Sequence, residues 1–102
     1  MIQILVVEDE KAISDLIRLN LTKAGYGVTT AYTGMEAADI LETENFDLII
    51  LDVMLPELDG FELMEYIRPL KIPVIYYLII TNSRMNYLPA YWQERVWTRS
   101  YF

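Results

Sequence analysis

The chain is organised around one stretch, Asp47-Leu48-Ile49-Ile50-Leu51-Asp52-Val53-Met54-Leu55-Pro56. Its leucines and isoleucines follow one another without alternation, which is typical of a strand buried on both faces of a parallel sheet. Asp52 comes directly after this run, and open α/β sheets form their sites beyond the carboxyl ends of their strands. Because a carboxylate there needs a cation, a proton or water, Asp52 is the first candidate for a functional residue.

Composition narrows the class of protein. A chain of 102 residues with 54% hydrophobic residues predicts a single small domain, covering 1–102, with a real core. Cysteine and histidine are both absent, which excludes disulfides, thiolate chemistry, imidazole catalysis and His-ligated metals. The net charge of -7 argues against direct binding of nucleic acid, which requires a basic face. No apolar run reaches the roughly 18 residues that span a bilayer, and no signal peptide is visible, so we expect a cytoplasmic protein without membrane contact.

Strand-like and helix-like patterns alternate along the first three quarters of the chain. Apolar runs predict strands at 2–7, 28–31, 47–52 and from 72 onward, and helical periodicity predicts helices at 12–24, 34–42 and 61–68. Gly25 ends the first of these helices. The alternation predicts an α/β fold, a doubly wound parallel sheet with right-handed crossovers and helices on both faces.

Acidic residues follow two of the predicted strands. Glu8, Asp9 and Glu10 come after the first strand, and Asp52 ends the third. An acidic triplet alone is more often a solvated helix start, where the helix dipole favours negative charge. In a sheet of order 2-1-3-4, however, strands one and three are neighbours, so Glu8, Asp9 and Asp52 would converge. Unit charges about 4 Å apart repel by about 4 kcal/mol at an effective dielectric of ~20, so the cluster needs protons or a hard cation, and oxygen ligands alone suit Mg²⁺.

These motifs resemble the receiver domain of two-component response regulators. The resemblance rests on the runs from Ile4 to Glu10 and from Leu51 to Pro56, followed by Asp59-Gly60, and it covers residues 1–75. It implies a flavodoxin-like fold with strand order 2-1-3-4. The run from Met54 to Leu63 resembles the subfamily that carries a winged-helix DNA-binding domain, and we expect no such domain within these residues.

The resemblance also implies roles for individual residues. Asp52 would be the phosphoacceptor, taking a phosphoryl group from a sensor histidine kinase in phosphorelay signalling and transcription regulation. Glu8 and Asp9 match the paired acids that hold Mg²⁺ with Asp52, and Met54 matches the position whose backbone carbonyl also binds the metal. A carboxylate nucleophile suits this chemistry, which depends on positioning and charge neutralisation.

The chain departs from the receiver pattern over residues 76–102. The pattern places a hydroxyl near position 78, where this chain has Leu78, and the nearest candidate for the switch hydroxyl is Thr81. No lysine follows Lys71, so the phosphate-binding lysine is missing. Aromatic residues crowd this tail, and Glu94 is its only acid. A frameshift near codon 76 would explain this change of character, because the tail read in the shifted frame agrees in part with the sequence that usually ends a receiver domain. A genuinely divergent tail is the alternative.

Three readings of function follow. The first is a receiver whose switching is impaired, and the second is a truncated receiver that binds metal but does not signal and acts as an oligomerising or interaction module. The third, a Mg²⁺-dependent phosphohydrolase, is disfavoured because Met54 stands where that class has a second acid. We therefore expect that the protein is not an enzyme. If the fifth strand is missing or replaced, the edge of the fourth strand is exposed, which predicts a homodimer through that edge and the aromatic tail.

Overall fold

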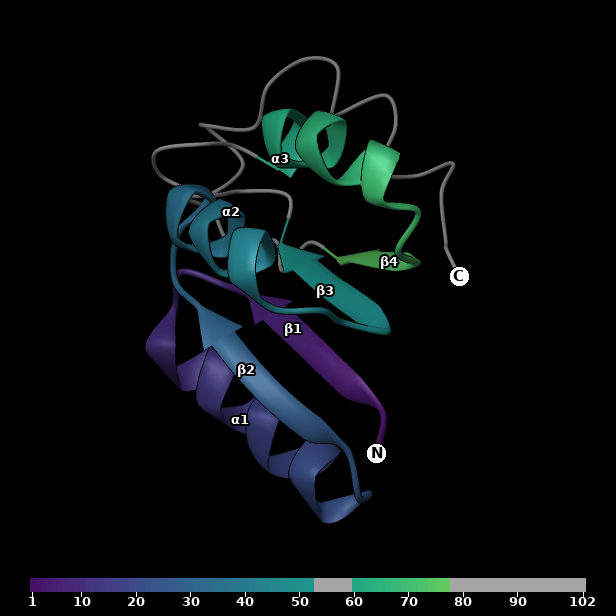
Figure 1. Ribbon diagram of the computed structural model, residues 1–102. Helices are drawn as coiled ribbons and strands as arrows, with labels where there is room; N and C mark the ends of the chain where they lie inside the picture. Colours follow the sequence, from purple (N-terminus) through teal and green to yellow (C-terminus); the bar gives the residue numbers. More distant parts are fainter. Residues whose placement is uncertain (53–59, 78–102) are drawn as a thin grey trace.

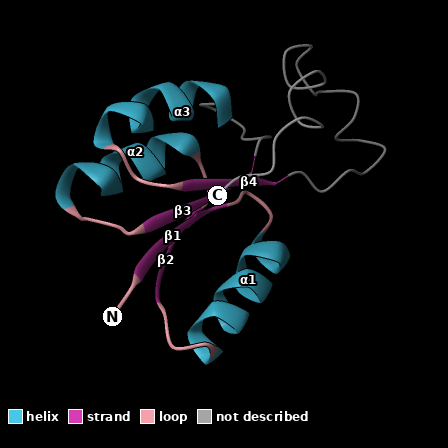
Figure 2. Cartoon of the chain, turned by 90° about the vertical axis from the view of Figure 1, so that its right-hand side faces the viewer, coloured by secondary structure: helices cyan, strands magenta, loops and turns pink. Residues whose placement is uncertain are grey.

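The computed structural model of the chain describes residues 1–52 and 60–77. Within them, four parallel strands form one sheet in the order β2-β1-β3-β4, with bounds β1 (Gln3–Val7), β2 (Gly27–Ala31), β3 (Leu48–Asp52) and β4 (Val74–Tyr77). The helices are α1 (Lys11–Lys23), α2 (Gly34–Thr43), α3 (Gly60–Ile67) and a 3₁₀ turn, η1 (Arg68–Leu70) (Figure 1). One face of the sheet carries α1, and the other carries α2 and α3 (Figure 2).

The predicted α/β fold is therefore confirmed, including the doubly wound arrangement and the order 2-1-3-4. The prediction that a fifth strand is missing or replaced concerns residues beyond Tyr77, which lie outside the described part of the chain. In the described ranges, no helix has both the length and the apolar character required to cross a bilayer.

The two central strands are buried because both faces of the sheet are covered. In β1, Ile4 is 2% exposed and Leu5, Val6 and Val7 are fully buried. In β3, Ile49 and Leu51 are fully buried as well. Since neither face meets water, an unbroken apolar run suits these strands better than alternation.

The main core lies between the sheet and the helices α2 and α3. Strand residues of β1, β2 and β3 contact apolar residues of both helices; the buried members are Leu5, Val7, Ala31, Ala37, Leu41, Phe46, Ile49, Leu51, Leu63 and Ile67. Leu63 and Ile67 are four positions apart, which places them on one side of α3. This core fixes the strands whose ends carry the acidic residues.

Truncating a side chain in this core is expected to be costly. Leu5→Ala should lower the free energy of unfolding by about 2–5 kcal/mol, because it removes buried methyl groups and leaves a cavity. Leu16→Ala is the matched control, since Leu16 is 60% exposed on α1 and should change stability by less than about 0.5 kcal/mol. Urea unfolding followed by circular dichroism measures both. Equal effects of the two substitutions would contradict this core.

Helix α1 has a narrower apolar stripe than its sequence predicts. Ile13, Ile17 and Leu21 are partly buried and lie at successive four-residue steps, whereas Leu16 and Leu19 are 60% and 50% exposed. At about 100° per residue, those two leucines point away from the stripe. The fully buried Ser14 occupies a place within it. The buried face of α1 therefore does not include all of its apolar residues.

Two helix ends and one strand start can be explained from single residues. Gly25 follows α1 with a positive φ of 97°, and the N–H groups of Gly25 and Tyr26 donate to the carbonyls of Thr22 and Leu21, as in a Schellman motif. The helix α3 ends at Ile67, one residue earlier than predicted, before the proline-containing η1. Strand β4 begins at Val74 rather than at residue 72. Pro73 has no N–H to donate, but its carbonyl accepts from the N–H of Ile49 at 3.0 Å.

Candidate functional site

Strand register places the acidic residues at one edge of the sheet. In the β1–β3 pair, Val7 lies opposite Leu51, so Glu8 and Asp52 each come one step further at the carboxyl ends of adjacent strands. The N–H of Glu8 donates to the carbonyl of Ala31 at 3.0 Å, which continues the ladder toward β2 and fixes the backbone of Glu8. This parallel pairing explains why Glu8 and Asp52 lie at the same edge of the sheet.

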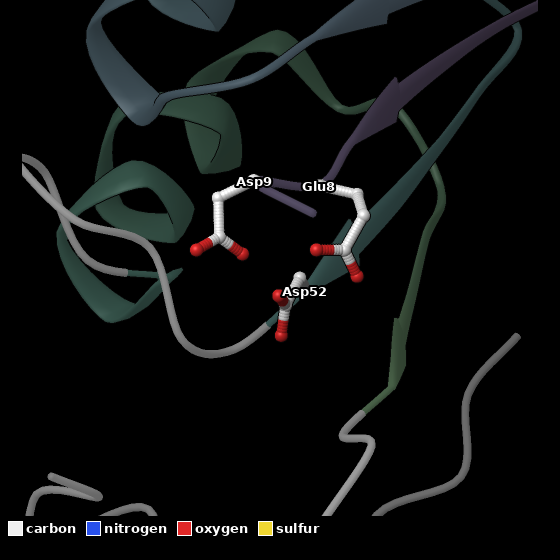
Figure 3. Close-up of side chains that lie close together, drawn as sticks. All are labelled: Glu8, Asp9 and Asp52. Atoms are coloured by element: carbon white, nitrogen blue, oxygen red, sulfur yellow. The ribbon is translucent and has the colours of Figure 1, made fainter. Parts of the chain in front are cut away.

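The structure brings together the three carboxylates that the sequence singled out. One carboxylate oxygen from each of Glu8, Asp9 and Asp52 lies within 4.8 Å of the others, and the three side chains face a common point (Figure 3). Glu8 and Asp52 are fully buried, whereas Asp9 is exposed. Solvated loop acids would not be buried in this way, so the arrangement favours a built site.

Charge repulsion makes this cluster a candidate cation site. Carboxylates this close repel by several kcal/mol at an effective dielectric of ~20, so protons or a cation must offset the charge. All three donors are carboxylate oxygens, which are the ligands that a hard cation such as Mg²⁺ prefers. The donor set therefore fits Mg²⁺ and offers no soft ligand for a thiophilic metal.

Glu8 is held in its charged form by hydrogen bonds. Burial acts to raise its pKa, but hydrogen bonding with the Glu10 N–H, the Tyr77 hydroxyl and the carboxyls of Asp9 and Asp52 outweighs burial and lowers the pKa below the usual 4.5. The Glu10 N–H lies 2.8 Å from Oε2 of Glu8, and the Tyr77 hydroxyl lies 2.5 Å from Oε1. Glu8 is consequently ionised at neutral pH, as a metal ligand must be. Any stability that this ionisation contributes is present above about pH 4.5 and is lost as the pH falls through the lowered pKa.

Sequence reasoning did not single out Tyr77. Its side chain reaches the site because β4 pairs with β3 in a register that sets Tyr77 beside Asp52. The signal was present in the chain, since aligning the apolar run that starts at Val74 with β3 brings the second tyrosine level with the aspartate. Two other predicted residues, Met54 and Thr81, lie outside the described residues, so the structure does not place the Met54 carbonyl or the Thr81 hydroxyl.

A doubly wound parallel sheet with buried acids at the carboxyl ends of β1 and β3 places the chain among α/β domains with an acidic site at the sheet edge, and comparison with known proteins identifies the family. The family model of the response regulator receiver domain matches residues 4–95 of this chain. The chain belongs to this family. The resemblance inferred from the sequence motifs is thereby confirmed.

Individual relatives agree with this assignment. Over 70 residues, the chain is 51% identical to the alkaline phosphatase synthesis transcriptional regulatory protein PhoP of Bacillus subtilis. The match covers 69% of this chain but only 29% of PhoP, so the chain spans less than a third of that relative.

Solved structures of receivers share the fold. The response regulator TrrA of Thermotoga maritima, solved in complex with Mg(2+)-BeF, is 35% identical with a TM-score of 0.74, covering 84% of this chain and 76% of that one. The chemotaxis protein CheY4 of Vibrio cholerae is 31% identical with a TM-score of 0.74, covering 85% and 76%. The Francisella response regulator 1452 receiver domain is 32% identical with a TM-score of 0.72, covering 82% and 72%.

Proposed function

We propose that Asp52 accepts a phosphoryl group from a sensor histidine kinase and that Glu8, Asp9 and Asp52 hold Mg²⁺ beside it. The observation that carries this proposal is the convergence of the three carboxylates within 4.8 Å in a chain of the receiver family. The structure of TrrA, a relative of similar fold, was solved with Mg(2+)-BeF, which supports the same ligand chemistry here.

The chemistry assigns a distinct task to each acid. A carboxylate oxygen of Asp52 attacks the phosphorus of a phosphohistidine, the phosphorus–nitrogen bond breaks, and the imidazole leaves with that electron pair, so Asp52 becomes an acyl phosphate. When bound, Mg²⁺ supplies positive charge that offsets the charge of the phosphoryl oxygens. Glu8 and Asp9 provide oxygen ligands, and the exposed Asp9 marks the side from which a phosphodonor can approach. By the family resemblance, the Met54 carbonyl completes the protein ligands.

Phosphorylation by a small donor tests the proposal without knowledge of the kinase. The chain is incubated with acetyl phosphate and Mg²⁺ and its intact mass is measured. We expect a gain of one phosphoryl group that disappears when EDTA replaces Mg²⁺. An unchanged mass in a chain that binds Mg²⁺ would contradict the phosphoacceptor role and favour the alternative, a receiver that binds metal without signalling.

We further propose that phosphorylation couples weakly to any output. The chain has no lysine after Lys71 and has Leu78 where the family pattern places a hydroxyl, with Thr81 as the nearest substitute. Without these groups, the phosphoryl group has fewer charged and hydrogen-bonding partners, so phosphorylation shifts neighbouring segments less. PhoP is a transcriptional regulatory protein, so transcription control is the output we propose for the full system. A large change in amide exchange after β4 on phosphorylation would contradict weak coupling.

Self-association is expected at the edge of β4. Among the described strands, β4 pairs only with β3, which leaves its other side as a sheet edge there. A parallel strand edge presents unpaired backbone groups that a second chain can bind. We therefore propose a homodimer that forms through this edge. The sequence predicts that the tail 76–102, which is rich in aromatic residues, is the second part of the dimer interface. Multi-angle light scattering should give twice the 12.0 kDa chain mass at micromolar concentration, and a monomer would contradict the proposal.

A further inference from the structure

A tyrosine hydroxyl reaches the acidic cluster from a strand that carries none of its acids. Tyr77 is the last residue of β4, and its hydroxyl donates to Oε1 of Glu8 at 2.5 Å. The ring is half-buried, and the register of β3 with β4 sets Tyr77 directly beside Asp52. The contact joins positions 69 residues apart in the chain, so it depends on the assembled sheet.

Both oxygens of Glu8 accept hydrogen bonds from fixed donors. The backbone N–H of Glu10 reaches Oε2 at 2.8 Å, and the Tyr77 hydroxyl reaches Oε1. The first donor belongs to the loop that enters α1, and the second belongs to β4 on the far side of β3. Because Glu8 is fully buried, these two donors help to set the plane of its carboxylate beside the carboxyls of Asp9 and Asp52. Of the two donors, Tyr77 is the one that a side-chain substitution can remove.

We propose that Tyr77 is a positioning residue for the metal site. Its hydroxyl holds the Glu8 carboxylate in the orientation in which it joins Asp9 and Asp52 around one divalent cation. The inference rests on the function proposed above and adds a residue that acts through Glu8 rather than on the metal. Hydrogen bonds from outer residues orient metal-binding carboxylates, and losing one typically costs 10–100-fold in metal affinity.

Removal of the hydroxyl alone separates positioning from packing. Tyr77→Phe keeps the ring and deletes the donor, so we expect its Mg²⁺ dissociation constant, measured by isothermal titration calorimetry, to rise about 10-fold or more. Tyr66→Phe is the matched control, because Tyr66 is a 39% exposed residue of α3; it should bind Mg²⁺ like the wild type. Circular dichroism and urea unfolding establish that each variant is folded.

A second variant distinguishes the hydroxyl from the ring. Tyr77→Leu removes both, so a hydroxyl-based role predicts similar losses of Mg²⁺ affinity in Tyr77→Phe and Tyr77→Leu, whereas a packing role predicts a loss in Tyr77→Leu only. The ultraviolet difference spectrum on Mg²⁺ addition should show a tyrosine signal in the wild type that is absent in Tyr77→Phe. If Tyr77→Phe binds Mg²⁺ as tightly as the wild type, or more tightly, the role of Tyr77 is overturned while the metal site stands. A wild-type chain that does not bind Mg²⁺ overturns both.

Discussion

Asparagine at position 52 is expected to abolish phosphoryl transfer to this chain. The carboxylate of Asp52 is both the proposed nucleophile and one of the three oxygen donors within 4.8 Å, and an amide is neither charged nor nucleophilic at neutral pH. After incubation with acetyl phosphate and Mg²⁺, intact mass spectrometry should show one added phosphoryl group on the wild type and none on Asp52→Asn. The effect is all or none because the substitution removes the carboxylate that forms the acyl phosphate.

The control for this experiment is an acid outside the cluster. Asp15 lies on α1 with its side chain 42% exposed, and it pairs with Lys11 at 3.1 Å. Asp15→Asn should gain the phosphoryl group as the wild type does. If Asp52→Asn still gained mass, the phosphoacceptor would be another residue, and peptide mapping of the labelled chain would locate it.

The same substitution is expected to stabilise the fold when divalent cations are absent. Asp52 is fully buried beside Glu8, which is held in its charged form, so the native state carries repulsion that the unfolded chain does not. In EDTA at neutral pH, Asp52→Asn should raise the free energy of unfolding by roughly 1–3 kcal/mol, after allowance for protons shared within the cluster. Urea unfolding measures this difference.

Magnesium should reverse the order of stability. At about 1,000 times its dissociation constant, a ligand that binds only the native state adds about 4.1 kcal/mol. The wild type should gain this amount and Asp52→Asn should not. Asp15→Asn, by contrast, should follow the wild type in both conditions. A lower stability of Asp52→Asn in EDTA would contradict net repulsion within the cluster.

The sequence predicted the sheet because burial on both faces leaves a readable pattern. The apolar runs around Leu5 and Ile49 had no alternation, and the acids directly after them marked the edge where a site forms. Strand order came from the family resemblance, since periodicity alone does not order strands. Glu8, Asp9 and Asp52 were therefore predictable as a group, although the full burial of Glu8 and Asp52 was not.

Other features depended on geometry that the sequence does not display. The contact of Tyr77 with Glu8 requires a particular register between β3 and β4, and a slip of one residue would send the side chain to the other face. On α1, Leu16 and Leu19 looked like part of the apolar face but are exposed, because the stripe follows Ile13 and Ile17 and includes Ser14. Helical periodicity indicated the presence of an apolar face without fixing its centre.

The most direct test of the central claim is a crystal structure of the chain grown with Mg²⁺ and beryllium fluoride. The account predicts one Mg²⁺ bound by Glu8, Asp9 and Asp52, directly or through water, with beryllium fluoride attached to a carboxylate oxygen of Asp52. Magnesium bound elsewhere, or an adduct-free Asp52 turned away from the other two acids, would contradict it.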